Sequence, residues 1–378
     1  MVQYQRLFRS RQRGRQVAVD VRHFVSIEDV TPEWFLDLYN VCRDMIQNPE
    51  RYVDACRGQV MASLFFEPST RTNFSFQTAM MRLGGSVFGF SDPSGTAVAK
   101  GESLADTIRM VSAYADAVVM RSPFEGAAAA GALYSEVPLI NAGDGGHMHP
   151  TQTLTDLTTI CEKRGKVGDI AVGLCGDLKN GRTVHSLALA LARFPNIQFK
   201  FIAPREMAMP GYVLDALRER GQRYIEVTNL ESSIPQLDVL YMTRIQKERF
   251  TDPLEYERNK GLYILTRRKL DRAKKDLLIM HPLPRVDEIS PDVDGDPRAA
   301  YFDQARYGMF IRMALLYRLI HTPRQAASTA YDPTPRICSN ERCITKTEAY
   351  LPNLTARGRN SETVCSYCDK PIPQLKNA

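Results

Sequence analysis

Residues 65–72 join an apolar segment to a group of hydroxyl side chains and one arginine. The segment reads FFEPSTRT, and apolar residues at helical spacing follow it from Asn73 to Leu83. A helix that begins near Ser69 would offer unpaired backbone N–H groups and a positive dipole end, and the Arg71 guanidinium could bind two oxygens at once. A simple helix cap needs only one Ser or Thr and gains nothing from an arginine. The pattern therefore predicts an oxyanion site, made by Ser69, Thr70, Arg71 and Thr72.

Four cysteines near the carboxyl end have the spacing of a metal site. Four residues separate Cys338 from Cys343, two separate Cys365 from Cys368, and twenty-one lie between the pairs. Two chelating turns of this kind fit four thiolates around one structural zinc ion, since the short polar segment between them could not fold on a core of its own. Disulfides are the alternative, which a reducing cytosol disfavours. The remaining cysteines are predicted to be reduced, buried residues: Cys42, Cys56, Cys161 and Cys175.

The totals indicate a globular protein of more than one domain. A chain of 378 residues with a net charge of +6 fits two ordinary domains and an additional element. Its longest apolar windows fall short of the roughly 18 residues that a membrane span needs, and its amino-terminal residues lack the apolar core of a secretory signal. We therefore expect a cytoplasmic protein without a membrane span. Residues 1–20 form a basic arm, predicted to be a solvated tail, with an organelle-targeting peptide as the alternative.

Helical and strand patterns alternate along most of the chain. Helices are predicted over 34–47, 73–83, 104–114, 154–161, 183–194, 212–220 and 308–319, and strands over 60–66, 87–90, 117–120, 169–174, 198–202, 239–242 and 277–280. Such alternation is typical of parallel sheets flanked by helices. The two rounds predict two α/β domains with a cleft between them, in which the carboxyl ends of the strands present ligand-binding groups.

Most polar motifs follow one of these strands. Arg121 follows the strand that ends at Met120, and the sequence HPTQ from His149 opens a helix after a glycine-rich loop. Further motifs lie at 176–183, 243–249 and 281–285. The inventory consists mainly of donors, including Arg71, Arg121, Arg182, Arg244 and Lys100. Such a set predicts binding of one or more dianionic small molecules.

Some of these motifs have other interpretations. The loop GDLKNGRT at 176–183 differs from a nucleotide P-loop by one residue, because Arg182 stands where that motif has lysine. A phosphate-cradling NTPase is therefore an alternative, although no acidic strand end suited to magnesium accompanies the loop. Taken alone, His149 could be a structural histidine and the charged run 244–249 a solvated turn.

Taken together, residues 20–320 resemble the catalytic chain of aspartate carbamoyltransferase. The turn at 69–72 resembles the carbamoyl phosphate signature shared by the aspartate and ornithine enzymes, and the blocks TRIQKER at 243–249 and HPLPR at 281–285 favour aspartate. The resemblance implies a carbamoyl-phosphate-binding domain over 21–153, completed by a helix over 308–320, and an aspartate-binding domain over 154–307. It also implies the reaction of carbamoyl phosphate with L-aspartate to give N-carbamoyl-L-aspartate and phosphate in de novo pyrimidine synthesis.

The resemblance assigns roles to individual residues. The phosphate would be bound by Ser69, Thr70, Arg71 and Thr72, the carbonyl oxygen by Thr72, Arg121 and His149, and the carbamoyl amide by Gln152. Arg71, Thr72, Arg121 and His149 would be catalytic, as donors that strengthen when the oxygen becomes negative. Aspartate would be bound by Lys100, Arg182, Arg244, Gln246 and the backbone carbonyls of Pro282 and Leu283. The reaction needs no cofactor for catalysis.

The resemblance also implies an assembly and shows departures from the family pattern. The segment Ser91–Ser103 resembles a family loop that brings Lys100 into a neighbouring subunit's site, which implies a homotrimer with shared active sites. Ala97 stands where the family usually has a phosphate-binding serine, so we expect weaker carbamoyl phosphate binding unless the loop shifts to bring Thr96 into its place. Asn73 and Gln77 replace an arginine and a glutamate, which removes a salt bridge.

Residues 336–378 resemble the zinc domain of the aspartate carbamoyltransferase regulatory chain. In that family the domain grips catalytic subunits, whereas in this chain it follows the catalytic part after a linker over 321–335, without the nucleotide-binding domain that normally precedes it. We therefore expect a trimer or a higher assembly through the zinc domain, and no control by ATP or CTP. Nucleic-acid binding is disfavoured by a moderate local charge and only two tyrosines. The alternative is a non-catalytic homologue that acts as an assembly subunit.

Overall fold

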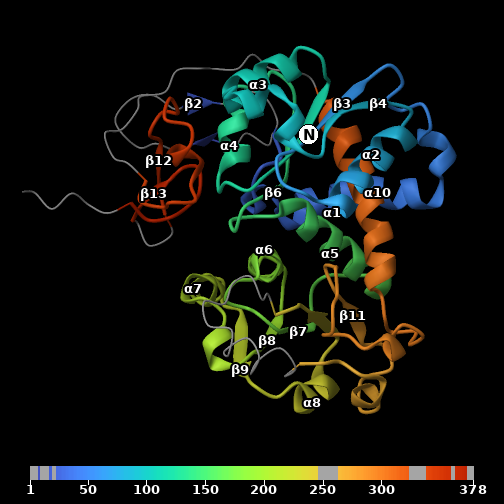
Figure 1. Ribbon diagram of the computed structural model, residues 1–378. Helices are drawn as coiled ribbons and strands as arrows, with labels where there is room; N and C mark the ends of the chain where they lie inside the picture. Colours follow the sequence, from blue (N-terminus) through green and yellow to red (C-terminus); the bar gives the residue numbers. More distant parts are fainter. Residues whose placement is uncertain are drawn as a thin grey trace, which may run out of the picture. The chain divides into compact units, whose positions relative to one another are not determined.

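The chain folds into two compact units (Figure 1). The computed structural model describes residues 7–8, 17–18, 23–245, 263–322, 338–358 and 362–372. Unit 1 comprises Met1–Asp29, Leu38–Thr151 and Arg312–Ala378, and unit 2 comprises Val30–Asp37 and Gln152–Ile311. We refer to residues 338–358 and 362–372 as the four-cysteine segment, which lies within unit 1.

Unit 1 is built on a four-stranded parallel sheet with the order β4-β3-β5-β6. Its strands are β3 (Val60–Phe65), β4 (Ser86–Phe90), β5 (Ala117–Ser122) and β6 (Leu139–Asp144). The apolar run of β3 suits an inner strand that is covered on both faces. The sequence pattern predicted the first three strands and missed β6, since its second half contains the weak strand formers Asn141, Gly143 and Asp144.

Helices and short strands complete unit 1. They include α2 (Thr70–Arg82), α3 (Leu104–Ser112), α4 (Ala127–Ala132), an antiparallel pair formed by β1 (Leu7–Phe8) and β2 (Val17–Ala18), and another formed by β12 (Thr355–Arg357) and β13 (Thr363–Cys365). All six residues of α4 are buried. The sequence analysis missed α4 because a run of alanine and glycine has no amphipathic period. One unit boundary lies between Asp29 and Val30, and the others fall inside α1 (Pro32–Gln47) and α10 (Tyr301–Ile320) and at the start of α5 (Pro150–Arg164).

Unit 2 is built on a five-stranded parallel sheet with the order β11-β10-β7-β8-β9. Its strands are β7 (Ala171–Cys175), β8 (Gln198–Ile202), β9 (Arg223–Val227), β10 (Val239–Met242) and β11 (Leu278–Met280). Its helices include α6 (Arg182–Leu191), α7 (Gly211–Glu219) and α8 (Leu230–Ser233). The pattern predicted every strand except β9, which lies at the sheet edge and is largely exposed. The predicted fold class, two α/β domains with parallel sheets, is confirmed.

A buried carboxylate ties three elements of unit 2 together. Asp156 in α5 is fully buried and accepts hydrogen bonds from Tyr241 in β10 at 3.0 Å and from Gln304 in α10 at 2.6 Å. Gln152, one turn earlier in α5, donates to the same carboxylate at 2.9 Å. A buried charge persists when it is surrounded by donors in this way. The predicted substrate residue Gln152 is thereby held in a fixed orientation.

Asn73 and Gln77, the two residues of α2 that depart from the family pattern, form an uncharged hydrogen-bonded pair. Gln77 donates its side-chain amide to Oδ1 of Asn73 at 2.8 Å, and the buried hydroxyl of Ser63 in β3 donates to the same oxygen at 2.8 Å. The amide pair thus anchors α2 to the neighbouring strand without a salt bridge.

Among the described helices, none combines the length and apolar character that crossing a bilayer requires.

Candidate active site and metal centre

The predicted oxyanion segment forms the start of α2. Ser69 occupies the N-cap position, and its side chain makes no capping hydrogen bond. Thr70 and Arg71 are exposed, and Thr72 is half-buried. The hydroxyls and the guanidinium therefore stand at the positive end of a helix of thirteen residues. This arrangement suits a phosphate group.

Arg121 lies in β5, the neighbour of the strand that leads into α2. Its Nε donates to Oε1 of Glu67 at 2.7 Å, and its Nη1 donates to the carbonyl of Ala142 at 3.3 Å. The side chain is only 13% exposed. Burial lowers the pKa of Arg121, the charge of Glu67 opposes this change, and the charge of Arg71 adds to it. Two guanidiniums that repel each other favour an anion between them.

Gly143 is the point at which Arg121 and His149 meet. A Cβ atom on Gly143 would lie 3.2 Å from Nη1 of Arg121 and 3.5 Å from Cδ2 of His149. Gly143 has a φ of 122°, a conformation that suits only glycine. His149 is 5% exposed, and its Nδ1 lies 3.5 Å from the hydroxyl of Thr151. The carboxyl ends of two neighbouring parallel strands thus bring two of the predicted residues together.

The loop predicted to serve a neighbouring subunit carries Lys100 at its surface. Lys100 ends the 3-10 turn Ala97–Lys100, and both Ala97 and Lys100 are exposed. The Thr96 hydroxyl donates to the carbonyl of Pro93 at 2.7 Å and accepts from the N–H of Val98 at 3.3 Å. Because Thr96 caps this turn, it could replace the absent serine only if the loop changed its conformation.

In unit 2 the loops after β7 and β10 lie against each other. The N–H of Thr243 donates to the carbonyl of Cys175 at 2.8 Å, and a Cβ atom on Gly176 would lie 2.3 Å from the carbonyl oxygen of Thr243. Arg182 begins α6 after the first loop, and Arg244 is the second residue after β10. Both side chains are half-buried. The predicted ligand Gln246 lies outside the described residues.

The loop at 176–183 differs from a phosphate cradle in its hydrogen bonding. Asp177 is fully buried, and its Oδ1 accepts from the backbone N–H of Asn180 at 3.0 Å and from the side-chain amide at 3.2 Å. In a P-loop such backbone N–H groups bind phosphate. A carboxylate already bound to one of them repels an anion, and the NTPase alternative loses its support.

His281 organises the turn that contains Pro282 and Leu283. Its Nδ1 accepts from the N–H of Leu283 at 2.8 Å, so the proton lies on Nε2, which donates to Glu288 at 2.6 Å. Burial raises the pKa of Glu288, but the hydrogen bonds from His281 and from nearby backbone N–H groups outweigh it and lower the pKa overall. Sequence reasoning identified the turn and missed Glu288, which lies seven residues from His281.

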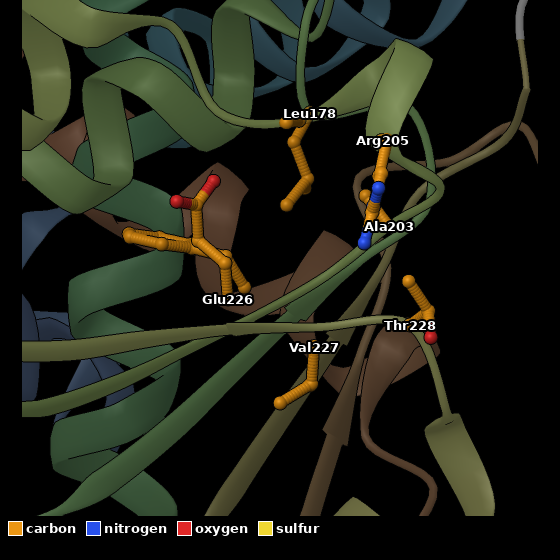
Figure 2. Close-up of a pocket in the computed structure, with 8 residues that line it drawn as sticks. Leu178, Ala203, Arg205, Glu226, Val227 and Thr228 are labelled. Carbon is orange, nitrogen blue, oxygen red and sulfur yellow. The ribbon is translucent and has the colours of Figure 1, made fainter.

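A separate pocket lies at the carboxyl ends of β8 and β9 (Figure 2). Its volume is about 430 Å³, and Leu178, Arg205, Glu226 and Thr228 are among its lining residues. Of the described residues predicted to bind substrate, none lines this pocket. Arg205 and Glu226 are exposed and opposite in charge, so the pocket has no excess of donors. We therefore do not assign the predicted substrate residues to this pocket.

Comparison with known proteins gives the family. Residues 22–162 match the sequence model described as "Aspartate/ornithine carbamoyltransferase, carbamoyl-P binding domain", and residues 168–319 match "Aspartate/ornithine carbamoyltransferase, Asp/Orn binding domain". The chain belongs to the aspartate/ornithine carbamoyltransferase family. The four-cysteine segment of this carbamoyltransferase lies beyond both matched ranges.

Relatives of this carbamoyltransferase include aspartate enzymes from bacteria and other organisms. The chain is 51% identical over 300 residues to the aspartate carbamoyltransferase catalytic subunit of Clostridium perfringens, which covers 79% of this chain and 98% of that protein. The catalytic subunit of M. jannaschii aspartate transcarbamoylase has a TM-score of 0.75 at 48% identity, covering 79% and 98% of the two chains. Trypanosoma cruzi aspartate transcarbamoylase, solved in complex with carbamoyl phosphate, has a TM-score of 0.74 at 41% identity, covering 79% and 96%.

The four-cysteine segment gathers its sulfur atoms at one point. All four Sγ atoms lie within 4.8 Å of one another; Cys338 and Cys368 are 3.6 Å apart, and Cys343 and Cys365 are 3.9 Å apart. Disulfide sulfurs would be about 2.05 Å apart, whereas four thiolates about 2.3 Å from one zinc ion would be about 3.8 Å apart. The cluster therefore fits a tetrahedral metal ion. The other four cysteines are buried, as predicted.

The four-cysteine segment packs on α3 and α4 in unit 1. Cys343 and Glu125 form a parallel β-bridge. The N–H of Glu125 donates to the carbonyl of Arg342 at 2.9 Å, and the N–H of Ile344 donates to the carbonyl of Glu125 at 2.9 Å. Buried side chains of the segment, including Leu351 and Tyr367, share one apolar cluster with the alanines of α4. Small residues on α4 permit this close approach. The segment and the sheet domain thus form a single core.

We predict that substitution Cys365→Ser removes the metal. Wild-type protein should contain about one zinc ion per chain, and the variant almost none, because three thiolates leave the tetrahedral site open. Atomic emission spectroscopy of the purified protein measures this ratio. Cys161→Ser, at a buried cysteine of α5, is the matched control and should retain the metal. A wild-type protein without zinc, or a Cys365 variant that keeps it, would contradict the assignment.

Proposed function

We propose that this carbamoyltransferase transfers the carbamoyl group of carbamoyl phosphate to the amine of L-aspartate, giving N-carbamoyl-L-aspartate and phosphate in pyrimidine synthesis. The observation that carries the proposal is the convergence of the α2 start, Arg121 and His149 at one edge of the unit 1 sheet. These donors surround the point where a small phosphorylated carbonyl compound could bind. Relatives with 50–51% sequence identity to this chain are named aspartate carbamoyltransferases, which supports aspartate as the acceptor.

Carbamoyl phosphate binds with its phosphate at the start of α2. Ser69, Thr70, Arg71 and Thr72 supply hydroxyls, N–H groups and a guanidinium to its oxygens. Its carbonyl oxygen accepts hydrogen bonds from Thr72, Arg121 and His149, and the side chain of Gln152 binds the carbamoyl amide. Glu67 fixes the orientation of Arg121, so the donors need little reorganisation when charge develops.

The reaction is a direct displacement at the carbonyl carbon. The aspartate amine forms the new C–N bond, the C–O bond to phosphate breaks, and the departing phosphate accepts the amine proton. Arg71, Thr72, Arg121 and His149 stabilise the negative charge that builds on the carbonyl and phosphate oxygens. Catalysis by positioning and preorganised charge of this kind requires no cofactor.

Aspartate binding uses residues from unit 2 and one lysine. Its carboxylates are bound by Arg182, Arg244, Gln246 and Lys100, while the carbonyls of Pro282 and Leu283 orient its amine. The hydrogen bonds of His281 to Leu283 and Glu288 support this role, because they fix the backbone of the turn. A Lys100 that stands exposed on its own loop suits a site shared between subunits of a homotrimer.

The four-cysteine segment is the structural zinc site of the chain, of the kind found in the regulatory chain of this enzyme family. Cys338, Cys343, Cys365 and Cys368 are its ligands, and their burial and sulfur spacing support the assignment. The alternative function, a non-catalytic assembly subunit, rests on Ala97 alone. The intact Arg71, Arg121 and His149 favour the enzyme.

Arg71→Ala should abolish most of the activity. Loss of the guanidinium removes a charged donor from the reacting phosphate, so we expect kcat/KM to fall by about 10²- to 10³-fold. Formation of carbamoylaspartate measures the rate, and calorimetry with carbamoyl phosphate measures binding. Arg82→Ala, in the last turn of the same helix, is the control and should act as wild type. A wild-type protein that binds carbamoyl phosphate but makes no product would favour the non-catalytic alternative.

Shared active sites predict complementation between inactive chains. Random trimers of Arg71→Ala and Lys100→Ala chains should regain activity at roughly a quarter of the sites, because there each intact residue comes from a different subunit. The mixture is assayed after dissociation and reassociation. A mixture of Arg71→Ala and His149→Ala should stay inactive, since one chain supplies both residues. Equal recovery in both mixtures, or none in the first, would count against the shared site.

Nucleotides should not regulate this enzyme. The chain carries a four-cysteine segment without the nucleotide-binding domain that accompanies it in the family's regulatory chain. The aspartate concentration that gives half the maximal rate should therefore stay the same with saturating ATP or CTP. Steady-state kinetics at a fixed carbamoyl phosphate concentration tests this expectation, and a clear shift with either nucleotide would refute it.

A further inference from the structure

The loop that leads from β6 to His149 is closed around the carboxylate of Asp144. Asp144 is 2% exposed. Its Oδ1 accepts from the N–H of Met148 at 3.0 Å, and its Oδ2 accepts from the N–H of Gly126 at 2.9 Å. The backbone closes as well, because the N–H of Asp144 donates to the carbonyl of Met148 at 3.2 Å. His149 follows Met148 directly, so these hydrogen bonds fix the backbone at the candidate catalytic histidine.

His147 joins this loop to the four-cysteine segment. Its Nδ1 lies 2.9 Å from Oδ2 of Asp144, and its Nε2 lies 3.1 Å from Oδ2 of Asp369. The imidazole is 12% exposed and the Asp369 carboxylate 48%, so the contact with Asp144 is shielded from water and the contact with Asp369 is partly open to it. One ring thus bridges a carboxylate of the loop and a carboxylate that is 222 residues away in the sequence.

Asp369 belongs to the cysteine turn of the metal site. It follows Cys368 directly, and its N–H donates to the carbonyl of Cys365 at 3.0 Å. The N–H of Cys365 in turn donates to the carbonyl of Lys370 at 2.9 Å. A turn closed in this way sets the position of the Asp369 carboxylate. An interaction that holds Cys365 and Cys368 together therefore also holds Asp369, the partner of His147.

Two further contacts run from the four-cysteine segment to Glu125 and Gly126, which themselves lie against the same loop. Asn340 donates to Oε2 of Glu125 at 2.8 Å, and Cβ atoms built on Gly145 and Gly146 would lie 3.1 Å and 2.9 Å from the Glu125 side chain. Tyr367 packs so closely on Gly126 that a Cβ atom there would lie within 2.6 Å of it. The first residues of the loop, Asp144 to Gly146, are therefore supported by residues that the segment holds.

We propose that the four-cysteine segment braces the loop that carries His149, and that His147 is the positioning residue that makes this connection through Asp144 and Asp369. The proposal rests on the proposed function in one respect, the role of His149 at the carbonyl oxygen. The metal site then acts on catalysis from a distance by fixing the loop. His147 itself touches no substrate.

Substitutions on either side of the bridge test the proposal. His147→Ala and Asp369→Ala should each lower kcat by roughly 3- to 30-fold, and the double variant should lose little more, because both remove the same connection. The dissociation constant for carbamoyl phosphate should change less, since the phosphate binds at α2. Asp369→Asn keeps an oxygen that accepts from Nε2 and should retain most of the rate. Glu341→Ala, at an exposed acidic residue of the same segment, is the control.

Further measurements separate the brace from other causes. Zinc content should stay near wild type in both single variants. The thermal midpoint should stay near wild type in Asp369→Ala, whereas His147→Ala should lower it by taking a donor from the buried Asp144 carboxylate. Hydrogen exchange in the peptide that contains residues 144–149 should become faster in both. Wild-type kcat in both single variants, additive losses in the double variant, or unchanged exchange would overturn the proposal. If the wild-type chain makes no carbamoylaspartate, the proposed function fails, whereas faster exchange in the variants would still support the brace.

Discussion

The buried carboxylate of Asp144 is the interaction on which the active-site edge of unit 1 depends. A charge at 2% exposure costs several kcal/mol unless donors surround it. Its donors come from the start of α4, from the loop that follows β6, and from the ring of His147. None of them can be removed alone without leaving the charge less well solvated. The entry to α4, the path of the loop and the docking of the four-cysteine segment are therefore parts of one arrangement.

Charge balance at the same edge explains why an anion belongs there. Glu67 neutralises Arg121, but Arg71 adds a second guanidinium close enough to disfavour the charged form of Arg121. The α2 dipole adds partial positive charge at the same end. In the proposed function, a dianionic substrate relieves this repulsion, and the same donors stabilise the charge that develops on its oxygens. Because the donors are held by a helix start and by strand ends, catalysis by preorganisation follows from the fold.

Features that depend on neighbouring residues could be predicted from the sequence, whereas features made by distant ones could not. The start of α2 and the spacing of the four cysteines are local patterns, and the structure has a helix start and a sulfur cluster at these places. The helix α4 could not be predicted, because its alanines are buried among the sheet, α3 and the four-cysteine segment, whose residues lie far away in the sequence. The contact of His147 with Asp369 has no sequence signal at all. The one hint was Gly126 beside a run of small residues, which indicates a close approach.

The four-cysteine segment also supports the loop that carries Lys100. The first N–H groups of α3, which follows this loop, donate to segment side chains: Leu104 to Glu348 at 3.2 Å and Ala105 to the hydroxyl of Tyr350 at 2.9 Å. Helix starts need such acceptors. The loop over 144–149 and the loop over 91–103 are therefore both anchored to elements that contact the four-cysteine segment. Since the segment is part of the same chain, its docking is intramolecular and does not depend on protein concentration. The proposed brace thus makes the order of both loops depend on the integrity of the four-cysteine cluster.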